Sequence, residues 1–208
     1  MINVGLIGYG YWGKIIHSKL KLISDVKFIC RSKDTYVDKL DSVDWVFVVT
    51  PDNTHLQKAI ELYDLADKNN VKLYVDDVFN YRSEIKELQN SIDKKKDIKV
   101  IWNTLKSKNY LNRLTWHDLY ILHPILDGEL KVEWPKINNI TFNYDVSDKK
   151  YHEVDGINLT HNHGSNDALF DMIDELLYDT DSINFQYNKD ITIQCERILK
   201  MIKDNIND

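Results

Sequence analysis

Three glycines near the start of the chain have the types and spacing of a site that binds a pyrophosphate. Gly8, Gly10 and Gly13 follow the apolar run 2–7 and precede a segment with helical periodicity. In this pattern the first glycine permits a tight turn, the second lets the backbone approach the phosphates, and the third lets helix and strand pack closely. The helix N-terminus would hold the anion with N–H groups and its positive dipole end. The segment therefore predicts a dinucleotide site, and a glycine-rich turn without a ligand is the alternative.

Three aromatic residues, Tyr9, Tyr11 and Trp12, flank the glycines. One of these planar rings could cover the adenine or the nicotinamide of a dinucleotide. Packing against a neighbouring loop is the competing interpretation. Tyr11 and Trp12 are counted among the candidate cofactor-binding residues.

The first half of the chain alternates strand and helix signals, which predicts a parallel sheet with helices on both faces. The expected strands lie near 2–7, 26–31, 44–49, 71–75 and 98–103. The expected helices lie near 11–23, 54–69 and 81–94. This region, 1–104, is predicted to be a Rossmann-type dinucleotide-binding domain.

The pattern changes at about residue 104, where we place the domain boundary. The sequence beyond it predicts a helix near 108–126, β-rich sequence at 137–144 and helices near 166–178 and 190–204. The candidate N-cap is Ser165 or Asn166 for the helix near 166–178, and Asp190 for the helix near 190–204. The fold class is therefore α/β, with a small α+β C-terminal domain at 105–208.

Composition excludes several classes of partner. The 208 residues carry a net charge of −6, which argues against nucleic acid and anionic membrane as partners. No apolar run approaches the length of a membrane span, and the start does not resemble a signal peptide, so the expected location is the cytoplasm. Cys30 and Cys195 are isolated and are expected to be reduced, buried thiols.

The end of the second expected strand indicates which dinucleotide is preferred. An acidic residue that binds the adenosine ribose usually stands there, but this chain has Arg31, Ser32 and Lys33. A guanidinium, a hydroxyl and an ammonium group suit a 2′-phosphate, which predicts NADP. A solvated basic turn is the competing interpretation, and the nearby Asp34 keeps NAD as the alternative cofactor.

Four stretches together resemble the Gfo/Idh/MocA family of NAD(P)-dependent oxidoreductases, many of which act on sugars, inositols or nucleotide-linked sugars. The stretches are 5–14, 43–51, 53–55 and 73–78, all in the first half of the chain. The resemblance implies that the strand end and the turn after it lie beside the cofactor. The residues concerned are Thr50, Pro51, Asn53 and His55.

A weaker match, 115–122, is similar to the helix of the family's substrate domain that carries a catalytic histidine. It makes His117 the candidate acid/base. The resemblance also implies a homodimer formed through the C-terminal sheet. The present chain is much shorter than usual members, and we expect the loss to fall in that sheet, which leaves a reduced second domain.

The chain departs from the family at its usual catalytic lysine. Members have Glu-Lys-Pro after the fourth strand, whereas this chain has Asp76, Asp77 and Val78. The family's aspartate four residues before the histidine corresponds to Arg113, so the two opposite charges would exchange places. Asp77 could assist proton transfer, and Arg113 could hold an anionic substrate. Asp76 is counted with the cofactor-binding residues, although it could be only a polar strand end.

Hydride transfer at an alcohol carbon requires a proton to move at the oxygen, and a histidine exchanges protons near neutral pH. His117 is therefore the proposed acid/base, and a hydrogen-bonded structural histidine is the competing interpretation. His161 and His163, with His152 and Asp155 upstream, could form a metal site. No third ligand has a specified spacing, so sugar binding or a polar loop explains them better and no metal is predicted.

The sequence thus predicts an NADP-preferring oxidoreductase that acts on a sugar-like substrate, or on another small polyol or carbonyl compound. The alternative is a nucleotide-binding sensor or accessory subunit that lost the family's lysine and with it the redox chemistry. A third hypothesis is non-redox chemistry on a nucleotide-linked or phosphorylated substrate.

Overall fold

The structure is a computed structural model that describes residues 1–31, 34–35, 37–49, 60, 63, 72–75, 78–105, 110–126, 130–160 and 167–207. Contacts within the chain define two compact units. The first comprises Met1–Lys58 with Asp167–Asn184, and the second comprises Ala59–Asn166 with Phe185–Asp208. Residue 104 lies inside the second unit, at the end of a strand, and the domain division expected there stays a prediction.

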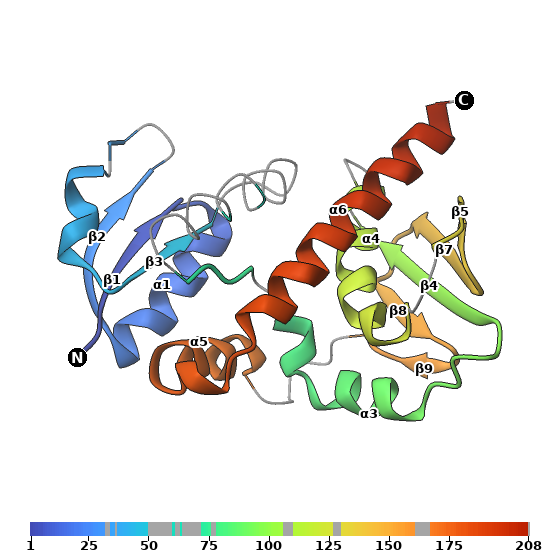
Figure 1. Ribbon diagram of the computed structural model, residues 1–208, viewed down its shortest axis with the longest axis horizontal. Helices are drawn as coiled ribbons and strands as arrows, with labels where there is room; N and C mark the ends of the chain where they lie inside the picture. Colours follow the sequence, from blue (N-terminus) through green and yellow to red (C-terminus); the bar gives the residue numbers. More distant parts are fainter. Residues whose placement is uncertain are drawn as a thin grey trace. The chain divides into compact units, whose positions relative to one another are not determined.

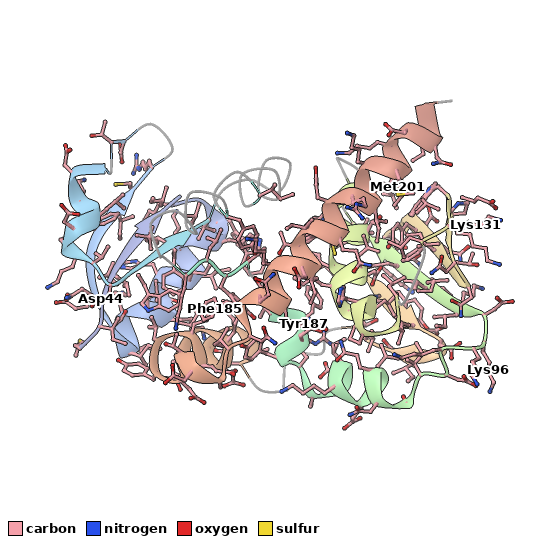
Figure 2. All side chains as sticks on the ribbon, viewed as in Figure 1. Asp44, Lys96, Lys131, Phe185, Tyr187 and Met201 are labelled. Carbon is pink, nitrogen blue, oxygen red and sulfur yellow. The ribbon has the colours of Figure 1, made fainter. Side chains whose placement is uncertain are left out.

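The first unit contains a parallel three-stranded sheet. Its strands are β1 (Asn3–Ile7), β2 (Asp25–Cys30) and β3 (Trp45–Val48), in the order β2-β1-β3. This confirms the Rossmann-type parallel arrangement, with β1 in the centre (Figure 1). Asp44, labelled in Figure 2, fixes the start of β3, because its carboxylate accepts a hydrogen bond from the Asn3 N–H at 2.8 Å.

Helix α1 (Tyr11–Ile23) has the bounds that the sequence predicted. Gly13, Ile16 and Leu20 lie on one face at helical spacing, and all three are buried. The helix ends where the backbone N–H and the hydroxyl of Ser24 both donate to the Leu20 carbonyl, at 2.8 and 2.7 Å. The amphipathic pattern therefore explains both the direction and the length of this helix.

A segment from late in the sequence completes the first unit. Helix α5 (Ala168–Tyr178) packs against α1, and the Tyr178 hydroxyl donates to the carbonyl of Ile23. The cap of α5 is Asp167, whose side chain accepts from the Phe170 N–H at 3.2 Å. The predicted caps Ser165 and Asn166 are therefore wrong, and both lie outside the described residues.

The second unit contains a six-stranded mixed sheet in the order β5-β6-β7-β4-β8-β9. Its strands are β4 (Ile98–Thr104), β5 (Val132–Glu133), β6 (Lys136–Ile137), β7 (Ile140–Val146), β8 (Tyr151–Val154) and β9 (Ile157–Asn158). β4 pairs in parallel with β7 and antiparallel with β8. The turn between β8 and β9 contains Asp155 and Gly156, both with positive φ.

Two strand predictions need correction. The strand at 98–103 was expected to join the N-terminal sheet, but β4 lies in the middle of the second sheet. Its apolar pattern suits a buried strand in either sheet, so the sequence of the strand does not determine which sheet it joins. Residues 72–75, expected as a strand, are described without strand structure.

In the described part of the second unit, three helices position its side chains. They are α3 (Ser83–Ser91), α4 (Tyr110–Leu122) and α6 (Phe185–Asn207). Short 3-10 helices occur in this unit at Val78–Tyr81 and His123–Ile125, and in the first unit at Val37–Ser42 and Thr180–Ser182. Helix α4 contacts both α3 and α6 (Figure 1). The predicted cap Asp190 is wrong, since it lies within α6 and accepts from the Gln186 side chain at 2.8 Å.

None of the described helices combines the length and the apolar composition that a membrane crossing needs.

Candidate functional site

The turn between β1 and α1 is closed around Gly8. This residue has φ +100°, which L side chains rarely adopt, and a Cβ there would lie 2.1 Å from the Val49 carbonyl oxygen. Its N–H donates to the Cys30 carbonyl at 2.8 Å, which fixes the turn to the end of β2. Gly8 therefore fulfils the turn role that the sequence predicted for it.

The other two glycines of the pattern differ in the space around them. A Cβ on Gly13 would lie 2.1 Å from the Gly8 carbonyl oxygen, so only glycine permits this approach of helix and turn. Among the residues that the structure describes, none has an atom within 4 Å of the corresponding position at Gly10. Gly10 is the N-cap of α1 and, as a glycine, offers no side chain to the first N–H groups of the helix. The open Gly10 backbone and the uncapped helix end fit a pyrophosphate.

Three aromatic residues lie around the glycines. Tyr11 and Trp12 are 77% and 58% exposed, and their rings meet edge to face with centroids 5.7 Å apart. Tyr9 instead packs on His17, with its hydroxyl 3.0 Å from Nδ1. Both rings are therefore accessible to a ligand. That one of them covers a ring of the cofactor stays a prediction.

Arg31 is exposed and follows directly after β2. Its backbone N–H donates to the Asp34 carboxylate at 2.7 Å, and the Asp34 N–H donates back to the Arg31 carbonyl at 3.0 Å. Asp34 therefore stabilises the turn. The guanidinium group of Arg31 has no hydrogen bond or ion pair within the described part of the chain. The other predicted cofactor and catalytic residues lie outside the described residues: Ser32, Lys33, Thr50, Pro51, Asn53, His55, Asp76 and Asp77.

In the second unit, His117 on α4 lies in an aromatic cluster. Its ring centroid is 4.7 Å from that of Phe79 and 6.1 Å from that of Trp102. Burial lowers the pKa of His117 from 6.5 to about 3, and the positive charges of Arg113 and His152 act in the same direction. At neutral pH this imidazole is therefore uncharged.

Behind Trp102 lies a buried polar group. The Trp102 ring stacks on His152 at 3.9 Å with an interplanar angle of 14°, and His152 Nε2 lies 2.8 Å from Asp118 Oδ1. The Tyr144 hydroxyl donates to the other Asp118 oxygen at 2.8 Å. Burial and the adjacent Asp118 carboxylate raise the pKa of Tyr144 well above its usual value. We call Trp102, His117, Asp118, Tyr144 and His152 the α4–sheet cluster.

The sequence pointed only to His117 in this cluster and placed His152 in a metal hypothesis. The structure gives His152 a buried carboxylate partner instead. The described residues contain no group of three side chains able to hold a metal, and His161 and His163 lie outside them. Asp118, Trp102 and Tyr144 left no local signal, because they meet only when α4 packs on β4, β7 and β8.

Arg113 lies one helical turn before His117 and is half-buried. Its Nη2 donates to the Thr104 hydroxyl at 3.0 Å. The structure thus brings Arg113 and His117 together on α4, as their spacing predicted. The expected encounter between Arg113 and Asp77 stays a prediction.

Comparisons with solved structures found several dehydrogenases. UDP-N-acetylglucosamine 3-dehydrogenase GnnA from Acidithiobacillus ferrooxidans aligns with 14% identity and TM-score 0.66 over 95% of this chain and 96% of its own. A putative NADPH-dependent oxidoreductase from Desulfitobacterium hafniense aligns with 10% identity and TM-score 0.67 over 98% and 96%. The WlbA dehydrogenase from Thermus thermophilus, in complex with NAD and UDP-GlcNAcA, aligns with 12% identity and TM-score 0.58 over 86% and 89%.

No protein-family model and no curated protein matches the sequence. At these identities the solved structures establish the fold. The resemblance to Gfo/Idh/MocA dehydrogenases that the motifs predicted is therefore confirmed at the level of the fold.

Proposed function

We propose that this chain is an NAD(P)-dependent oxidoreductase of the Gfo/Idh/MocA type, with a sugar-like substrate. The observation that carries this proposal is the contrast between the glycines of the turn. Gly8 and Gly13 have no room for a side chain, whereas no atom of the described residues lies within 4 Å of a Cβ at Gly10, the N-cap residue of α1. Several solved structures with this fold are named as dehydrogenases, which supports the proposal.

In this function the first unit holds the cofactor. The backbone at Gly10 and the first N–H groups of α1 would bind the pyrophosphate, and Tyr11 and Trp12 would cover a ring. When bound, a nicotinamide cofactor supplies the acceptor or donor of the hydride. The second unit supplies His117 for the proton at the substrate oxygen. Because its imidazole is uncharged at neutral pH, one ring nitrogen can accept the hydrogen bond of a substrate hydroxyl.

The test of the proposed acid/base is His117→Ala, assayed for reduced-cofactor absorbance with a panel of sugars, sugar nucleotides and inositols. Loss of the proton acceptor should lower kcat by at least about a hundredfold, with cofactor affinity unchanged. His123→Ala, in the same unit near the end of α4, is the matched control and should retain the rate. Equal turnover of His117→Ala and the wild type would reject the assignment. Tight cofactor binding without turnover on any substrate would favour the nucleotide-binding alternative.

Preference for NADP is a finer part of the proposal and rests on Arg31. Its exposed guanidinium at the end of β2 is available to a 2′-phosphate. Arg31→Ala should lower the affinity for NADPH by about tenfold and leave the affinity for NADH unchanged, because only NADPH has the extra phosphate. Arg197→Ala on the exposed side of α6 removes the same charge elsewhere and should change neither affinity. If Arg31→Ala kept the wild-type ratio of affinities, Arg31 would have no part in the preference.

A further inference from the structure

Arg113 is a half-buried cation with an incomplete set of partners among the residues that the structure describes. Its guanidinium has five N–H donors, and Nη2 bonds the buried Thr104 hydroxyl at 3.0 Å. A hydroxyl does not neutralise the charge, and no carboxylate pairs with Arg113 within the described part of the chain. Withdrawing a charge from water costs free energy unless an opposite charge compensates it.

The carboxylate closest in sequence is already engaged. Asp118, on the same helix, accepts hydrogen bonds from His152 at 2.8 Å and from Tyr144 at 2.8 Å. At the start of α3, Arg82 ion-pairs with Glu84 and lies 5.7 Å from the centre of the Phe79 ring. Among the described groups around His117, the other charges are thus matched and Arg113 is not.

The position of Arg113 connects it with the proposed acid/base. Residues four apart on a helix lie on one face, so the guanidinium and the His117 imidazole are neighbours. The rings of Phe79 and Trp102 pack on His117, and Thr104 at the end of β4 holds the guanidinium. A group that binds Arg113 therefore comes close to the imidazole.

We propose that Arg113 is an anion-binding residue that holds a carboxylate or phosphate group of the substrate beside His117. The substrate is then an acidic or phosphorylated sugar, and a neutral sugar is a poor ligand. This inference rests on the proposed function and specifies its substrate class. A planar guanidinium can form two parallel hydrogen bonds with a carboxylate or a phosphate, and these charge-assisted bonds are stronger than neutral ones.

Binding of the anion also prepares His117 for its role. The positive charge of Arg113 is one cause of the low pKa of His117, after burial, and the charge of His152 adds to it. An anion on Arg113 offsets that charge, so the pKa of His117 rises when the substrate binds. The imidazole then becomes a better proton acceptor only in the presence of the correct ligand.

The experiment compares three sugars that differ in one group. D-glucose, D-glucuronate and D-glucose 6-phosphate are titrated by calorimetry at fixed ionic strength, and NMR of 13C-histidine-labelled protein follows the His117 ring. Wild-type protein should bind at least one of the two anions about tenfold more tightly than glucose. The same anion should raise the pKa of His117. Glucuronate and glucose 6-phosphate separate a carboxylate ligand from a phosphate ligand.

Two substitutions of Arg113 and one control test the residue itself. Arg113→Gln should abolish the preference for the anions, whereas Arg113→Lys should retain part of it because the charge remains. Arg197→Gln, which removes a charge from the exposed side of α6, should behave like the wild type. Equal binding of all three sugars, binding of neither anion, or an unchanged preference in Arg113→Gln would overturn the proposal.

Each titration is run with and without bound NADPH, so that the two proposals fail separately. Absence of NADPH binding would contradict the proposed function, while the anion preference at Arg113 is still measured on the free protein. NADPH binding without an anion preference would overturn only the inference about Arg113. An unchanged thermal unfolding midpoint in Arg113→Gln shows that any loss of preference arises at the site.

Discussion

The glycine turn of the first unit and the α4–sheet cluster of the second are built in different ways. The glycines of the turn lie within six consecutive residues, Gly8 to Gly13, although Gly8 is also held by the backbone carbonyls of Cys30 and Val49. The cluster is defined by side chains from α4, β4, β7 and β8, which are far apart in sequence. A turn that needs glycines at fixed spacing can therefore be recognised in the sequence, whereas a packed network of side chains cannot. Mutations should therefore separate binding from folding at the turn but not in the buried part of the cluster.

The largest effect is expected at Asp118, the buried acceptor of the cluster. Asp118→Ala leaves His152 and the Tyr144 hydroxyl without their partner, and breaking a buried pair costs about 4 kcal/mol of unfolding free energy. Tyr144→Phe is the milder companion, because it removes one donor and leaves the contact between His152 and Asp118, at about 1 kcal/mol. Denaturant unfolding monitored by circular dichroism measures both. Similar small losses for the two variants would mean that the cluster does not support this unit.

Gly8→Ala should have the next largest effect. The new Cβ would meet the Val49 carbonyl oxygen at 2.1 Å, and the residue would be strained at φ +100°. We expect a loss of about 3 kcal/mol in unfolding free energy. Gly10→Ala adds the same atom where no described atom lies within 4 Å, so it should leave the midpoint of unfolding unchanged. If the two variants lost equal stability, the division of roles between these glycines would be wrong.

Titration of His117 links the cluster to pH. The pKa of His117 falls from 6.5 to about 3 on folding, so the unfolded chain binds more protons between these values. The contribution of His117 to the unfolding free energy is therefore fully present above about pH 6.5 and decreases as the pH falls towards 3. At pH 5 the loss is about 2 kcal/mol relative to pH 7. His117→Asn should reduce the pH dependence of the unfolding free energy by that amount. A variant with the wild-type pH slope would show that His117 titrates normally.

Much of the fold was predictable where the signal was local. The bounds of α1 follow from its apolar face, and the pattern of Gly8, Gly10 and Gly13 gave the turn and the first strand. The assignment of β4 to the second sheet was not predictable, because its residues suit a buried strand in either sheet. The start of α6 was misplaced because the polar Asp190 resembles a cap, although it lies inside the helix.

The candidate site shows the same division. Arg113 and His117 could be connected from their spacing, since residues four apart share a helix face. Asp118 was not identified, although it is adjacent to His117 in the sequence. Its role depends on His152 and Tyr144, which come from two strands of the second sheet. Only tertiary packing brings such partners together.

The most direct test of the account is calorimetric titration of the wild type and Gly10→Val with NADPH and NADH at fixed salt. A Cβ at Gly10 meets no described atom within 4 Å, and a valine side chain there would obstruct a pyrophosphate at the backbone. We predict that the wild type binds the cofactors, that Gly10→Val loses at least about a hundredfold in affinity, and that its thermal unfolding midpoint is unchanged. Absence of binding by the wild type, or equal affinity in the variant, would contradict the dinucleotide site on which the proposed function depends.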